Sequence, residues 1–271
     1  MTTLQKIIKY LAIGLAFAIM IGMVSGLVKL GMLLSKEPGD SDPVLKDPQS
    51  WTFVEPVTHL EINLVGLEVQ VQEGPAFTVE TDSGYLRCTQ KGGKVTIQER
   101  KHSLVNAGNT GTLKITLPAD LVLEKVAIDA GAGDFDIGLL RAQKLDLDLG
   151  AGKVRLSGLQ ITADTDIDGG AGQIMIQNST LTNLDLDLGV GDLELSGQVL
   201  GNSEIDCGVG KVALSLDSGD QYRLRLDNGI GSATLNGQEM VGSTYYGTGP
   251  NNLEISGGIG SIQIELAHSE G

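Results

Sequence analysis

The sequence repeats a Gly-x-Gly motif seven times in its second half, at intervals of 19 to 21 residues and then a final interval of 29. Such a short period is typical of a small unit that is copied and stacked, because a unit of this size cannot bury its own apolar face. The repeat therefore predicts a solenoid, and it constrains the architecture more than the chemistry. The first glycines of the motifs are Gly131, Gly150, Gly170, Gly189, Gly208, Gly229 and Gly258.

Apolar and polar residues alternate on both sides of each motif. Alternation with a period of two over short runs indicates β-strands with one buried face and one solvated face. Each repeat is therefore predicted to be a strand, a glycine corner, a second strand and a loop, with coils of about 19–20 residues paired in parallel register. The core should contain the residue three before each first glycine: Ile128, Leu147, Ile167, Leu186, Ile205, Leu226 and Ile255.

The glycines are expected to form corners, because glycine adopts positive φ easily and lets two backbones approach closely. The small or branched residue between them, such as Ala151 or Val190, is expected to be buried as a plug in the corner. A dinucleotide site is not indicated. That fingerprint needs a third glycine and a following helix, whereas another alternating strand follows each corner here.

Residues 10–34 are predicted to form one transmembrane helix. Nineteen uncharged, mostly apolar residues separate Lys9 from Lys29, and about twenty such residues span a bilayer. Lysines precede the span and acidic residues follow it, so residues 1–9 should be cytoplasmic and the body extracytoplasmic, on a single-pass membrane protein. A cleaved signal peptide is the competing interpretation, although the apolar stretch runs past the small residues that cleavage would need.

The rest of the chain divides by composition into a tether, an irregular β-rich part, a regular solenoid and a tail. The net charge is −15 for the whole chain and +1 for residues 1–50, so the remainder carries −16. A body this acidic should repel nucleic acid, and no nucleic-acid partner is expected. The predicted boundaries are 35–50 for the tether, 51–120 for the irregular part, 121–266 for the solenoid and 267–271 for the tail.

The run from Leu113 to Pro118, followed by Val126 to Asp134 and the repeated Gly-x-Gly strands, resembles the bacterial "putative adhesin" family of unknown function, or toastrack domain. The resemblance covers roughly residues 57–266. It implies a single-chain β-solenoid, often on one membrane anchor, and an association with cell-envelope stress systems. It brings no catalytic residue, so we expect no enzyme activity and no cofactor.

An acidic column is expected on the solvated face, where like charges at strand spacing repel unless something relieves them. One interpretation is an Asx turn, in which each carboxylate accepts a hydrogen bond from the glycine amide two residues on. The other is a shared hard cation such as Ca²⁺, with Asp148, Asp168, Asp187 and Asp206 as candidate ligands. The column is Asp129, Asp148, Asp168, Asp187, Asp206 and Asp227, and a second column four before the glycines is Asp146, Asp166, Asp185, Glu204 and Glu254.

Tyr245 and Tyr246 lie in the insertion that lengthens the final interval. Excursions from a solenoid commonly lie on its binding face, and tyrosine is favoured at interfaces. Both tyrosines are therefore candidates for contacting a partner. A plain surface loop, or a cap over the last coil, is an equal alternative.

The sequence thus predicts a membrane-anchored extracytoplasmic scaffold or binding protein, adhesin-like or linked to an envelope stress response. Its partner would be an unidentified envelope protein or cell-surface ligand. The alternative is a Ca-dependent polysaccharide-acting β-helix enzyme, which is disfavoured because no aromatic residue lies between Asp136 and Gln221. A module that oligomerises through solenoid faces is a third possibility, against which the negative charge argues.

Overall fold

The computed structural model describes residues 48–99, 111–240 and 244–267. The predicted cytoplasmic N-terminus, the transmembrane helix and nearly all of the tether lie outside the described residues, as does most of the tail. Among the described residues, no helix is long and apolar enough to cross a membrane. The described residues all belong to the second of the chain's two units, Leu45–Gly271.

The described part of Leu45–Gly271 is one sheet of sixteen strands with a single 3-10 turn, η2 (Gly219–Gln221), which confirms the predicted all-β class. The strands are β1 (Gln49–Phe53), β2 (His59–Leu64), β3 (Glu68–Gly74), β4 (Phe77–Thr81), β5 (Leu86–Lys91), β6 (Lys94–Glu99), β7 (Thr112–Pro118), β8 (Leu123–Gly138), β9 (Arg141–Ser157), β10 (Gln160–Thr182), β11 (Leu184–Leu200), β12 (Asn202–Leu216), β13 (Tyr222–Leu235), β14 (Gln238–Met240), β15 (Thr244–Tyr246) and β16 (Asn251–Leu266).

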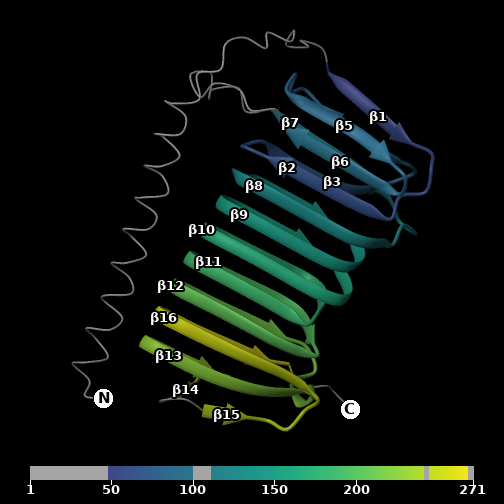
Figure 1. Cartoon of the computed structure of the whole chain (residues 1–271). Coiled ribbons are helices and arrows are strands. Elements are labelled where there is room, and N and C mark those ends of the chain that lie inside the picture. The colour runs from purple at the N-terminus through teal and green to yellow at the C-terminus, as the bar shows by residue number, and fades with distance from the viewer. Residues whose placement is uncertain (1–47, 100–110, 241–243, 268–271) are drawn as a thin grey trace, which may run out of the picture. The chain divides into compact units, whose positions relative to one another are not determined.

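Strands β8 to β12 stack in parallel register, one coil above the next, as predicted (Figure 1). The register joins equivalent positions of successive repeats, so that Ala171 lies opposite Ala151 on one side and Val190 on the other. Each coil differs from the expected pair of short strands, because one strand runs through the glycine corner without a break. We call the parts before and after the corner the first and second arms.

The core is one contiguous apolar cluster that runs the length of the stack. The alternation in each arm places every second side chain inside, and the predicted core column is confirmed, since all seven of its residues are buried. A short third side closes each coil and adds residues such as Leu159 and Ile161 to the core. The third side is bounded by backbone in the left-handed region, for example Gly158 at φ 65° and Asn183 at φ 47°.

The residue between the two glycines is exposed, so the expectation that it plugs the corner is wrong. Exposed fractions are 43% for Val190 and 40% for Ile259. The residue just before the first glycine fills the corner instead, as Leu149 and Leu188 do. The alternation is interrupted at the bend, since Leu149 before it and Val154 after it are both buried although they are five residues apart, and the residue between the glycines faces out. We call the exposed residues Val190, Val209, Ile259 and Ile230 the apolar corner row.

The last coils are not stacked in chain order. β16 pairs with β12 on one side and with β13 on the other, so the final repeat of the sequence lies inside the stack. β14 and β15 pair antiparallel with β13, which is the outermost coil. The long final interval therefore consists of a two-strand cap and the return of the chain to the place that it had skipped.

The other end of the stack has the same arrangement in reverse. β2 and β3 form the coil beside β8, β6 and β7 form the next coil outward, and β4 and β5 pair antiparallel with that outer coil. The part predicted as irregular therefore contains two coils of the regular kind and a cap. At each end the antiparallel strands occupy an edge that could otherwise pair with another chain.

Candidate functional site

The two acidic columns lie side by side on the outer face of the first arms, one residue of each column per coil. Asp168 is in register with Asp148 and Asp187, and Asp166 is in register with Asp146 and Asp185. The centre of this face, on β10, β11 and β12, is a block of six carboxylates. We call it the acidic ladder: Asp166, Asp168, Asp185, Asp187, Glu204 and Asp206.

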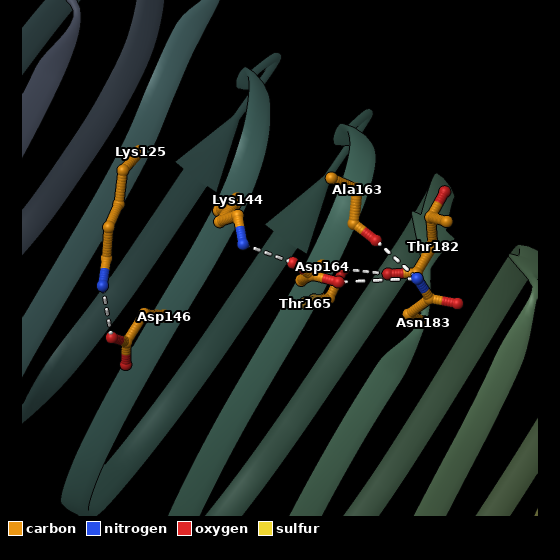
Figure 2. Close-up of polar contacts among 8 residues, drawn as sticks. All are labelled: Lys125, Lys144, Asp146, Ala163, Asp164, Thr165, Thr182 and Asn183. Atoms are coloured by element: carbon orange, nitrogen blue, oxygen red, sulfur yellow. Dashed lines mark hydrogen bonds and ion pairs between the residues drawn. The ribbon is translucent and has the colours of Figure 1, made fainter.

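Basic side chains contact acidic residues near the two ends of this face but not in its centre. At one end Lys125 contacts Asp146 at 3.0 Å, and Lys144 contacts Asp164 at 2.6 Å (Figure 2). At the other end Arg225 contacts Glu254 at 2.7 Å. None of the six ladder carboxylates has an ion pair with another described residue. The second column is therefore paired at both of its ends, Asp146 and Glu254, and the centre of the face has no ion pair among the described residues.

Partial burial and mutual repulsion change the acidity of the ladder. Burial, followed by the charges of neighbouring aspartates, raises the pKa of Asp166, Asp168 and Asp187 above the ordinary value. The charge of Asp206, followed by burial, raises the pKa of Glu204. By contrast, the hydrogen bond from Lys144 lowers the pKa of Asp164. The ionised ladder is thus a source of unfavourable electrostatic energy in the folded protein.

The Asx-turn interpretation of the aspartate column is not supported. Among the described residues, none of these carboxylates accepts a hydrogen bond from a glycine amide of its corner, and the buried Oδ1 atom of Asp206 has no partner. The corner stays within the sheet, since parallel pairing includes Gly169 and Ala171 on the two sides of Gly170.

The cation candidates Asp148, Asp168, Asp187 and Asp206 stand in single file, one to a coil. Across the described residues, no group of three or more histidine, cysteine, aspartate or glutamate side chains is placed to hold a metal ion. Ca²⁺ takes six to eight oxygen ligands, and a single file offers each ion only the carboxylates above and below it. The stacking therefore places one candidate carboxylate above the next and does not gather three of them around one point in the described structure.

The two candidate tyrosines, Tyr245 and Tyr246, lie on opposite faces of β15. Tyr245 is 62% exposed and lies opposite Arg225, whose guanidinium carbon is 5.8 Å from the ring centre. Tyr246 lies opposite Leu224, a buried residue. Because neighbouring residues of a strand point to opposite faces, only Tyr245 shares the outer face with the acidic columns. The cap interpretation of the insertion is correct, since β15 covers part of β13.

Asparagines at the turn between the third side and the first arm were missed by the sequence analysis. Asn183 donates to the carbonyl oxygen of Ala163 at 2.9 Å and to Asp164 at 3.4 Å (Figure 2). Its Oδ1 atom accepts the amide of Asn202, and Asn252 donates to Asn202 at 2.8 Å. The signal was available, because Asn183 and Asn202 are 19 residues apart. They form a polar border along the acidic face.

These features define a class of protein: a single-chain β-solenoid with glycine corners, capped at both ends by antiparallel strands, with one strongly acidic outer face. The chain belongs to the Toastrack DUF4097 family, whose profile matches residues 77–265, more than half of its length. No curated protein matches the chain.

Several solved structures resemble the chain. One is described as a "putative cell adhesion protein" from Clostridium sporogenes, with 15% identity, coverage of 82% of this chain and 99% of that chain, and a TM-score of 0.38. Another is a "putative adhesin" from Bacteroides fragilis, with 12% identity, coverage of 83% and 99%, and a TM-score of 0.34. A third, from Parabacteroides distasonis, has 13% identity, coverage of 82% and 96%, and a TM-score of 0.30.

Proposed function

We propose that the protein is a membrane-anchored extracytoplasmic scaffold without catalytic activity, and that it binds a basic partner protein of the cell envelope through the acidic ladder. The observation that carries this proposal is the in-register stack of six carboxylates without ion partners among the described residues. Neighbouring strands are about 4.8 Å apart, so the carboxylates of the ladder repel one another strongly. This repulsion opposes folding, so folding alone does not explain the ladder.

A basic partner would relieve this repulsion. Lysine or arginine side chains laid along the ladder would neutralise carboxylates whose pKa is raised by burial and by one another's charges. Complementary charge also accelerates encounter and excludes acidic competitors, and its effect weakens as salt rises. Binding through the ladder should therefore be strongly dependent on ionic strength.

The apolar corner row supplies the second component of an interface. It begins beside the ladder, because Val190 follows Asp187 by three residues and Val209 follows Asp206 by three. Exposed branched side chains next to charge match the anatomy of protein interfaces, which have an apolar centre and a polar rim. The partner surface would then combine basic residues with a neighbouring apolar stripe.

The membrane anchor gives the scaffold its location. The apolar stretch at residues 10–34 would hold the body at the outer face of the cytoplasmic membrane through the tether at residues 35–50. An adhesin-like role and a role in an envelope stress response both require such a tethered binding face. Protease added to intact spheroplasts should digest the body, and full protection until lysis would contradict this orientation.

Crosslinking, followed by capture of the protein from native membranes, tests whether it binds a basic partner. The wild-type protein should capture a basic protein that high salt releases, and the double variant Asp168→Asn with Asp187→Asn should lose it. Glu194→Gln is the matched control, because it removes a carboxylate from the second arm of β11 and leaves the ladder intact. Equal capture by the double variant and the control, or capture of a protein without net positive charge, would refute the proposal.

A further inference from the structure

A groove of about 580 Å³ crosses the outer face at the C-terminal end of the stack. Its lining residues are Asn183, just before β11, and residues of β11, β12, β16, β13 and β15, which lie next to one another in that order. Five strands at about 4.8 Å spacing give a length of roughly 19 Å. The groove is therefore long enough for a chain of several units rather than a single small molecule.

The charges in the groove nearly cancel, although two of its carboxylates, Asp185 and Glu204, also belong to the acidic ladder. Asp185, Glu204 and Glu254 contribute three carboxylates, and Arg223 and Arg225 contribute two guanidinium groups. An anionic ligand would meet the three carboxylates, and a cationic ligand would meet the two arginines. A neutral ligand encounters neither penalty.

Contacts within the groove fix its polar groups and leave hydrogen-bonding capacity on them. Arg225 donates to Glu254 at 2.7 Å, and Asn252 donates to Asn202 at 2.8 Å. Amides and guanidinium groups supply donors beside the acceptors of Glu254 and Asn252. Such mixed pairs suit hydroxyl groups, because each hydroxyl both donates and accepts a hydrogen bond.

Tyr245 adds a flat apolar surface at the outer end of the groove. Its ring is 62% exposed, and its position is fixed by pairing with β13 and by the guanidinium group of Arg225. An aromatic ring beside polar groups fits a ligand with one apolar face and a polar rim. A sugar ring has this form, since its C–H groups and its hydroxyl groups point in different directions.

We propose that this groove binds a neutral oligosaccharide, with one sugar ring against Tyr245 and hydroxyl groups on Arg225, Glu254, Asn202 and Asn252. An extended peptide fits less well. Peptides that join a sheet use a free backbone edge, whereas the strands that floor the groove are already paired with their neighbours. The groove shares Asp185 and Glu204 with the acidic ladder, but the residues proposed to hold the sugar lie outside the ladder, so the two proposals are tested by different variants.

The test uses the full-length protein in nanodiscs on an array of immobilised neutral, acidic and amino-sugar oligosaccharides. Binding to neutral oligosaccharides is expected, with little change between low and high salt because no ion pairs are exchanged. The best neutral oligosaccharide from the array is then titrated by calorimetry. Tyr245→Ala should weaken its binding by about tenfold or more, as loss of an aromatic anchor does.

Tyr246→Ala is the matched control, because the same residue type is removed one position away, on the opposite face of β15. Tyr246→Ala and the double variant Asp168→Asn with Asp187→Asn should both bind the oligosaccharide with the wild-type affinity. Absence of binding to every neutral oligosaccharide, preference for charged ones, or equal losses in Tyr245→Ala and Tyr246→Ala would each overturn the proposal. Matching melting temperatures of the two tyrosine variants would show that both fold.

Discussion

A Cβ atom on Gly172 would stand 1.9 Å from the carbonyl oxygen of Gly152, the residue at the same position of the preceding coil. The obstacle is backbone, so it cannot move aside as a flexible side chain would. The φ of Gly172 is also +148°, a conformation that residues with side chains rarely adopt. Two separate reasons therefore require glycine here: the bend of one chain and the close approach of the next.

Gly172→Ala should lower the free energy of unfolding by about 2–4 kcal/mol, from backbone strain together with overpacking. Gly66→Ala is the control. A Cβ atom on Gly66 would lie 3.6 Å from the oxygen of Ala132, an ordinary contact, so the loss should be less than about 1 kcal/mol. Chemical denaturation of both variants measures the difference in the free energy of unfolding. Similar losses of stability would show that the close approach of neighbouring coils does not dictate the Gly-x-Gly motif.

The phenol of Tyr222 connects β13 to a distant coil. The amide of Val199 donates to its Oη atom at 3.0 Å, and Tyr222 is 1% exposed. Tyr222→Phe would leave that buried amide without a partner, at a cost of about 1–3 kcal/mol in the free energy of unfolding. Tyr246→Phe, at an exposed site, should change stability by less than about 0.5 kcal/mol. A thermal melt that does not separate the two variants would contradict the structural role of this hydrogen bond.

The regular half of the fold was predictable because each coil obeys the same local rule. Alternation fixed which side of every arm is buried, and Leu147 and Ile167 in the core column are 1% and 0% exposed. The period of 19 to 21 residues then fixed the register. Both are short-range properties of the chain, so the sequence displays them directly.

The order of the coils was not predictable from the repeat. β16 and β13 carry the same Gly-Ile-Gly motif, and the alternation of apolar and polar residues would allow either strand to pair with β12. Antiparallel pairing of β14 and β15 with β13 makes the difference, because it occupies the outer edge of β13. Such pairing depends on contacts between residues far apart in the chain, which a local pattern does not contain.

The candidate site was predicted in part. The outward direction of Asp168 and Asp187 follows from alternation, but the lack of ion partners depends on where lysines of neighbouring coils fall. Lys144 reaches Asp164 because the two are in register, and no lysine occupies the equivalent place beside the ladder. The distinction between Tyr245 and Tyr246 likewise required the register of β15 against β13.

Mild acidification should stabilise the protein. A carboxyl group whose folded pKa is raised binds its proton more readily in the folded state, so stability increases as the pH falls through that pKa toward the unfolded value of about 4. Asp166, Asp168, Asp187 and Glu204 all have this sign. The melting temperature should therefore rise as the pH falls from neutral toward the unfolded pKa of about 4.

The opposite sign applies to two other acids. The hydrogen bonds from Lys94 and Lys144 lower the pKa of Glu61 and Asp164, so the stability that these groups contribute is lost only as the pH falls below about 4.

The double variant Asp168→Asn with Asp187→Asn should be more stable than the wild type at neutral pH, and its melting temperature should rise less on acidification. A melting temperature that falls steadily from pH 7, or a double variant with the wild-type pH profile, would contradict the repulsion argument.

Removal of residues 251–271 should take an interior coil out of the stack. β16 places Leu253, Ile255, Ile262 and Ile264 in the core between β12 and β13. Four buried side chains at about 1.5–3 kcal/mol each amount to roughly 6–12 kcal/mol, which is comparable to the total stability of a typical domain.

A solenoid stacked in chain order would lose only its last coil and one interface between coils on such a truncation. Here the truncation removes two interfaces, so hydrogen exchange should show loss of protection in β13 and β15 as well as in β12. Removal of residues 268–271 alone is the control and should leave exchange unchanged. Retention of full protection in β13 after the longer truncation would show that β13 can stack directly on β12, and that the inserted coil is not needed to hold the C-terminal cap.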